Sequence, residues 1–137
     1  MEQIAPIPHL PRTVKAEEEK LLAGRLVIFK GFSAQKDFTA VHTGANALRD
    51  DIFGCVQRDT VDPKAVPAPD PNNAGLRTET VGHGSVVWVE CEGEVKTGEK
   101  VQTVAGGKVK ALEEGKNAVG KLIGPSGKNT LIEVELF

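Results

Sequence analysis

Short apolar segments alternate with glycine-containing turns over the last third of the chain, Gly93 to Phe137. In the final segment, Ile132, Val134 and Leu136 alternate with charged residues, which is the two-residue period of a strand with one buried face. The turns follow one another too closely for helices to fit between them. The pattern therefore predicts an all-β fold, a small antiparallel barrel or sandwich.

The earlier part of the chain contains segments of the same kind. Strands are predicted at residues 25–30, 38–42, 52–57 and 85–91. The first of these is expected to bury Leu26 to Phe29, and Gly54 inside the third indicates a bulge or a close backbone contact. Residues 14–22 fit either a helical turn or the approach to the first strand, and residues 45–51 have room for one helical turn.

Two proline-rich segments differ from the rest. Residues 1–13 are predicted to form an extended N-terminal arm, because proline lacks an N–H and favours extended geometry in the residue before it. Residues 59–77 are predicted to form a long loop inserted into a single β domain that covers residues 14–137. Each segment has two interpretations. It is a tail or loop that binds no partner, or it becomes ordered when it binds one.

The two halves of the chain show a similar order of segments. Gly24 corresponds to Gly98, and Val27 corresponds to Val101. The segment at residues 85–90 corresponds in the same way to the closing segment, with Val87 and Val89 matching Ile132 and Val134. The pattern predicts one barrel or sandwich built of two similar β halves, with chance repetition as the alternative.

Composition and charge exclude several classes of protein. The chain has 137 residues, a net charge of −2 and few aromatic residues, and no basic patch stands out, so we expect no nucleic-acid partner. No apolar run has the length of a membrane span, and the N-terminus lacks the apolar core of a secretion signal. Cys55 and Cys91 fit a reducing compartment rather than a disulfide scaffold.

The residues that could carry chemistry do not form a known motif. His9, His42 and His83 are far apart and lack metal-ligand spacing. A catalytic Cys–His pair can be assembled in space, but Cys55 lies in an apolar strand and is better explained as a small buried residue. Nucleophile-elbow and phosphate-loop motifs are absent from the sequence. We therefore expect no enzyme activity, cofactor, metal or small-molecule substrate.

One alternative is a carrier domain of the lipoyl or biotinyl type. In those domains a modified lysine lies at a hairpin tip, and here Lys108 and Lys110 follow the turn at Gly106–Gly107. The biotin signature, a lysine between methionines, is absent because Met1 is the only methionine.

The complete pattern resembles the capsid cement, or head decoration, proteins of tailed bacteriophages. The segments that carry the resemblance are Gly98 to Val101, Gly107 to Ala111, Val119–Gly120 and Ile132 to Leu136. The long loop and the proline-rich arm depart from the family pattern. The resemblance implies a non-enzymatic virion protein, made in the host cytoplasm, that binds the outer capsid surface. It further implies a homotrimer that clamps neighbouring major capsid subunits.

The two proline-rich segments are the candidate contacts with the capsid or with other copies of the chain. Extended segments that contain proline lose little entropy on ordering and can add to an exposed sheet edge. The predicted contact residues are Ile4, Ile7, Leu10, Val66, Pro67, Pro69, Pro71 and Leu76. The alternative from another class is a general β-barrel adaptor module.

Overall fold

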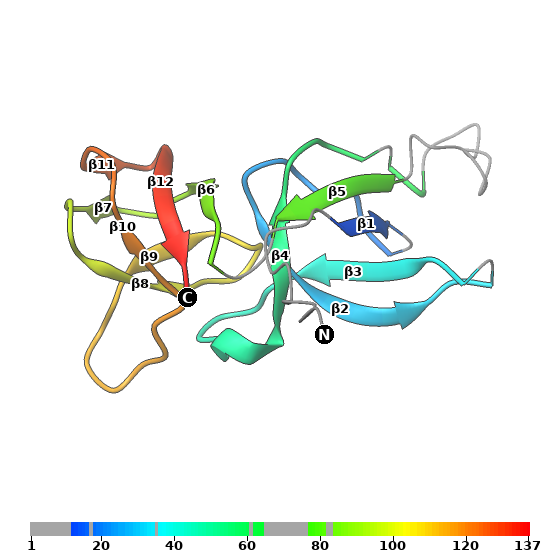
Figure 1. Ribbon diagram of the computed structural model, residues 1–137, viewed down its shortest axis with the longest axis horizontal. Helices are drawn as coiled ribbons and strands as arrows, with labels where there is room; N and C mark the ends of the chain where they lie inside the picture. Colours follow the sequence, from blue (N-terminus) through cyan, green and yellow to red (C-terminus); the bar gives the residue numbers. More distant parts are fainter. Residues whose placement is uncertain (1–11, 17, 35, 61, 65–76, 82–83) are drawn as a thin grey trace, which may run out of the picture.

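The computed structural model describes residues 12–16, 18–34, 36–60, 62–64, 77–81 and 84–137. The described residues form strands and one 3-10 turn, which confirms the all-β prediction. Two β units lie side by side along the long axis of the molecule (Figure 1). In the part of the chain that the structure describes, no helix is long and apolar enough to span a membrane.

The first unit is a closed five-stranded barrel with the strand order β1-β3-β2-β4-β5. Strand β1 runs parallel to β3, and the other neighbouring strands are antiparallel. The 3-10 turn η1 (Arg49–Asp51) precedes β4, within the segment predicted to hold a helical turn. The strands are β1 (Arg12–Lys15), β2 (Leu26–Phe32), β3 (Phe38–His42), β4 (Ile52–Val56) and β5 (Arg77–Val81).

The second unit is a five-stranded antiparallel sheet with the order β6-β12-β10-β8-β9, and a two-stranded sheet of β7 and β11 accompanies it. Its strands are β6 (Val86–Glu90), β7 (Glu94–Val95), β8 (Lys100–Thr103), β9 (Val109–Ala111), β10 (Gly120–Leu122), β11 (Gly127–Lys128) and β12 (Leu131–Leu136). The alternation predicted for the last strand is observed, because Ile132, Val134 and Leu136 are all buried.

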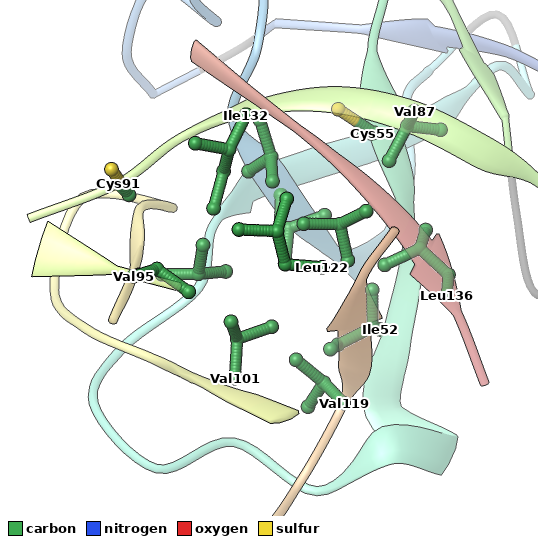
Figure 2. Packing of buried hydrophobic residues seen from close by; sticks show 14 residues of the cluster. Ile52, Cys55, Val87, Cys91, Val95, Val101, Val119, Leu122, Ile132 and Leu136 are labelled. Carbon is green, nitrogen blue, oxygen red and sulfur yellow. The ribbon is translucent and has the colours of Figure 1, made fainter. Parts of the chain in front are cut away.

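One hydrophobic core joins the two units. Leu26, Ile52 and Cys55 from the barrel belong to the same buried cluster as eleven residues of the second unit. Figure 2 shows Ile52 and Cys55 among the side chains of this cluster, together with Leu122 and Leu136. Each fully buried leucine or valine stabilises the fold by about 1.5–3 kcal/mol, so the shared cluster favours a fixed arrangement of the two units.

Polar contacts reinforce this junction. The Leu26 amide donates a hydrogen bond of 2.8 Å to the carbonyl of Gly107, and the Gly107 amide donates to the carbonyl of Thr43 at 3.2 Å. Gly107 has φ +79°, and a Cβ at this position would lie 2.6 Å from the Leu26 carbonyl oxygen. The β8–β9 turn therefore needs glycine both for its backbone conformation and for its close approach to the barrel.

Strands β2 and β4 contain the irregularity that Gly54 predicted. Val27 faces Gly54, whereas the next residue, Ile28, faces Ile52, so Phe53 is an extra residue in the ladder. Two residues on one strand opposing one on its partner define a β-bulge.

Other sequence-based expectations are corrected by the topology. Residues 85–90 do not complete the first half of the chain, because β6 pairs with β12 in the second sheet. Val87 and Val89 are the cross-strand partners of Val134 and Ile132, a pairing that the repeated rhythm does not predict. Such pairing is non-local, so a repeated rhythm in the sequence does not reveal it.

The predicted segment boundaries also change. Arg12 and Thr13, assigned to the arm, lie in β1, and Arg77, assigned to the long loop, begins β5. Residues 12–15 form a strand, so the first residues of the segment 14–22 are not in the helical turn that was one of its two predicted structures. The division into an arm and a single domain stays a prediction.

Candidate interaction surfaces

The predicted contact residues lie outside the part of the chain that the structure describes. This applies to the three in the arm, Ile4, Ile7 and Leu10. It applies equally to those in the long loop, which are Val66, Pro67, Pro69, Pro71 and Leu76. Their role therefore stays a prediction, and the described surface has to be considered by itself.

Four of the five phenylalanines form a cluster on the barrel, here called the phenylalanine cluster: Phe29, Phe32, Phe38 and Phe53. Their ring centroids lie 5.3–6.0 Å apart in five pairs. This spacing is typical of favourable aromatic contacts, each contributing about 0.5–1.5 kcal/mol beyond burial.

The β-bulges explain how these residues meet. Residues three apart on a regular strand point to opposite faces of the sheet. Between Phe29 and Gly31 the register of β2 against β3 shifts by one residue, so Phe29 faces Ala40 while Phe32 faces Phe38. Both side chains therefore share the face that carries Ala40, and Ala40 belongs to the buried core of the barrel.

The cluster thus continues the barrel core outward at the end formed by the β2–β3 hairpin. Phe38 and Phe53 are half-buried and pack against the inner cluster of Val14, Leu21 and Val27. Phe29 and Phe32 remain 43% and 64% exposed. The expectation that Phe29 is buried is therefore wrong, although its side chain shares the face of β2 and β3 that carries the buried Ala40. A contiguous group of exposed aromatic side chains is typical of a protein contact surface.

The strand pattern of the sequence does not predict this cluster, although the sequence contains a signal for it. All four phenylalanines fall in or beside strands that the sequence predicts, and they are four of the six aromatic residues (Phe and Trp) in the chain. Strict alternation places Phe29 and Phe32 on opposite faces, so the cluster becomes visible only once the bulge is known.

A second apolar surface lies between the two units. Trp88 is 55% exposed, and Val86 and Leu131 beside it are also exposed. They line an open groove of about 250 Å³ that we call the β6 groove. Across from them it is lined by Ala23, Gly24, Val56 and Gln57 of the barrel. Gly24 is tightly placed, because a Cβ there would lie 2.7 Å from the Leu131 side chain.

His42 has a structural environment. Its Nε2 accepts a hydrogen bond of 3.1 Å from the Leu22 amide, so the ring proton of the neutral form lies on Nδ1, 3.3 Å from Glu19. Burial lowers the pKa of His42 below its ordinary value of 6.5, with a smaller lowering by Arg25, while Glu19 acts in the opposite direction. The neutral imidazole therefore links two backbone segments. His9 and His83 lie outside the described residues.

The cysteines are buried, as the sequence predicted for Cys55. Burial raises the pKa of the Cys55 thiol to about 12, which disfavours the thiolate that a nucleophile needs. The Cys91 thiol lies 3.4 Å from the Gly93 carbonyl oxygen. Among the described residues, histidine, cysteine and carboxylate side chains nowhere gather in a group able to hold a metal ion.

The two candidate carrier lysines are held by neighbouring carboxylates. Lys108 lies 3.6 Å from Glu90, and Lys110 pairs with Glu113. The turn before them packs against Leu26 rather than projecting into solvent. A carrier lysine has to reach the active sites of other proteins, so this geometry does not favour the carrier alternative.

The overall fold resembles that of a known phage protein. The chain matches the crystal structure of the N base of the head fiber protein gp8.5 in bacteriophage phi29 with a TM-score of 0.65. The match covers 93% of each chain at 16% sequence identity, so it shows a shared fold. No protein-family model and no curated protein matches the sequence.

Proposed function

We propose that this protein is a non-enzymatic structural protein of a phage virion, located on the outer surface of the head. The observation that supports it most is the shared fold with a head fiber base, over nearly the full length of both chains. The sequence pattern also resembles that of head decoration proteins, which supports the same proposal.

The proposed action is to clamp neighbouring major capsid subunits and so stabilise the shell. The core shared by the two units suits this role, because a body that does not flex transmits force between the subunits it contacts. Many copies on a lattice then act together through multivalency.

The phenylalanine cluster is the described surface that we assign to the shell. Phe29, Phe32 and Phe38 come from the β2–β3 hairpin, and the tip of this hairpin points away from the second sheet (Figure 1). The predicted contacts of the arm and long loop add to this surface, and we propose that the protein binds as a homotrimer.

Co-sedimentation tests this function. The purified protein is mixed with expanded, undecorated heads of the phage that encodes it and then pelleted. The proposal predicts saturable binding in a fixed ratio to the major capsid protein, and a mass in solution of three chains of 14.6 kDa each. Failure of the folded protein to bind heads would favour the adaptor alternative.

A matched pair of variants tests the contact surface. Phe32→Ser removes the most exposed ring of the cluster, whereas Leu48→Ser removes an apolar side chain that is similarly exposed but lies outside the cluster. Loss of a central aromatic contact costs about 2 kcal/mol, or about thirtyfold in affinity. We expect this loss for Phe32→Ser and unchanged binding for Leu48→Ser. If the two variants bound heads with equal affinity, the phenylalanine cluster would not be part of the interface.

A further inference from the structure

Strand β6 has one edge that no other strand covers within the described residues. It is the first strand of its sheet and pairs with β12 alone. The Cys91 amide donates to the Thr130 carbonyl, and the Leu136 amide donates to the Ser85 carbonyl. The backbone groups of the odd-numbered residues therefore hydrogen-bond to β12, and those of the even-numbered residues point to the opposite edge of β6.

This free edge borders the β6 groove. Two contacts from the barrel cover the later part of this edge. The Glu90 amide donates to the Gly24 carbonyl at 2.8 Å, and the Cys55 thiol donates to the Trp88 carbonyl at 3.5 Å. Val86 and Trp88 come earlier on the strand, and both line the groove. An extended segment lying there would bury apolar surface on Trp88 and Leu131. It could pair with the amide and carbonyl of Val86 and with the amide of Trp88.

The N-terminal segment can reach this groove. Described structure begins at Arg12, which faces Thr80 on β5, and Thr80 faces Val56 on β4. Neighbouring strands are about 4.8 Å apart, so the backbone of Arg12 lies about 10 Å from that of Val56, which lines the groove. Residues 1–11 can span up to about 35 Å when extended.

The prolines of this segment are spaced for strand addition. In an extended strand, alternate residues direct their N–H groups to the same side. Pro6 and Pro8 lie on one side, and the N–H groups of Ala5, Ile7 and His9 lie on the other. Proline is tolerated in an edge strand when its nitrogen faces solvent, so one edge of this segment can pair while the prolines occupy the other.

We propose that residues 3–9 bind in the β6 groove of the same chain, where they add a short strand to the free edge of β6 and cover Trp88. In the free protein this gives the arm a binding site on its own body. The segment would have to leave the groove before Ile4 and Ile7 could contact a capsid. The free protein then carries its arm in a fixed place, and the groove is closed to other extended segments.

Trp88 provides the test, because it is the only tryptophan and the chain has no tyrosine. Its fluorescence and its quenching by acrylamide report directly on coverage of the groove, without capsids. In the full chain we expect Trp88 to be protected from quenching. A chain lacking residues 2–10 should show red-shifted emission and lose the protection, and a synthetic peptide of residues 1–11 should restore it.

Two isoleucines provide a matched pair that tests strand pairing. Ile7→Pro removes an N–H on the pairing side, whereas Ile4→Pro removes one on the outer side. We expect Ile7→Pro to expose Trp88 and Ile4→Pro to leave it protected. Equal effects would refute strand addition, and an unchanged Trp88 signal in the truncated chain would refute docking. Protection that disappears on dilution would assign the groove to a second copy and overturn the proposal for the same chain.

Discussion

At the scale of single residues, Gly107 marks the closest approach of the two units. Its φ of +79° is costly for other residues, and a Cβ would contact the Leu26 carbonyl oxygen at 2.6 Å. Gly107→Ala is therefore expected to lower the free energy of unfolding by at least about 2–3 kcal/mol. Gly115 has the same φ with nothing within 4 Å. Gly115→Ala should cost only about 1 kcal/mol. Urea denaturation measures both, and equal losses would mean that the approach at Gly107 is not tight.

His42 makes stability depend on pH. Its pKa is lowered in the folded protein, chiefly by burial, so the unfolded chain binds the proton more readily. The contribution of His42 is fully present above its unfolded pKa of about 6.5 and declines as the pH falls through that value. Protonation also removes the Nε2 acceptor of the Leu22 amide.

The test compares the wild-type protein with the His42→Gln variant and measures how the free energy of unfolding of each depends on pH. The glutamine amide oxygen can still accept a hydrogen bond but does not titrate near neutral pH. The wild-type protein is expected to lose more stability than the variant between pH 7 and pH 5, the range about the unfolded pKa of histidine. Parallel pH curves would show that the pKa of His42 does not change on folding.

At the scale of elements, Arg25 and Glu90 connect the segment before β2 to the end of β6. Glu90 Oε2 accepts from Arg25 Nε at 2.9 Å and lies 2.8 Å from Nη2, and the two side chains are only 16% and 33% exposed. A double-mutant cycle with Arg25→Met and Glu90→Gln should give a coupling energy of about 1 kcal/mol. The exposed pair Lys30–Glu18 serves as control, with an expected coupling of a few tenths at most. A coupling no larger than that of the control would contradict a role in joining the units.

Individual strands could be predicted from the sequence, but their partners could not. Alternation in β12 and the β-branched run in β6 follow from burial of one face, and both were recognised. The pairing of β6 with β12 joins residues more than forty positions apart and leaves no local signal. β5 was missed because the polar sequence RTETV follows a proline-rich run and reads as part of the loop.

The candidate surfaces show the same division. The sequence pointed to apolar residues in the arm and long loop, because apolar side chains in exposed segments suggest a partner. The phenylalanine cluster was missed because the bulge between Phe29 and Gly31 reverses the face expected for Phe32. A one-residue change of register moves every following side chain to the other face, and only the folded ladder shows where it occurs.

At the scale of the whole molecule, two β units behave as one body because they share a core. Leu26, Ile52 and Cys55 belong to the barrel by chain position but are buried with the second sheet. Their removal would therefore separate the units as well as open a cavity. This construction leaves Phe29 and Phe32 of the phenylalanine cluster exposed on the barrel, and the β6 groove open between the units.

The most direct test of the proposed function is cryo-electron microscopy of expanded heads with and without the added protein. The proposal predicts extra density on the outer surface, at junctions between neighbouring major capsid subunits, into which the two-unit body fits with the phenylalanine cluster toward the shell. Heads without extra density, or with density only on the inner surface, would contradict it.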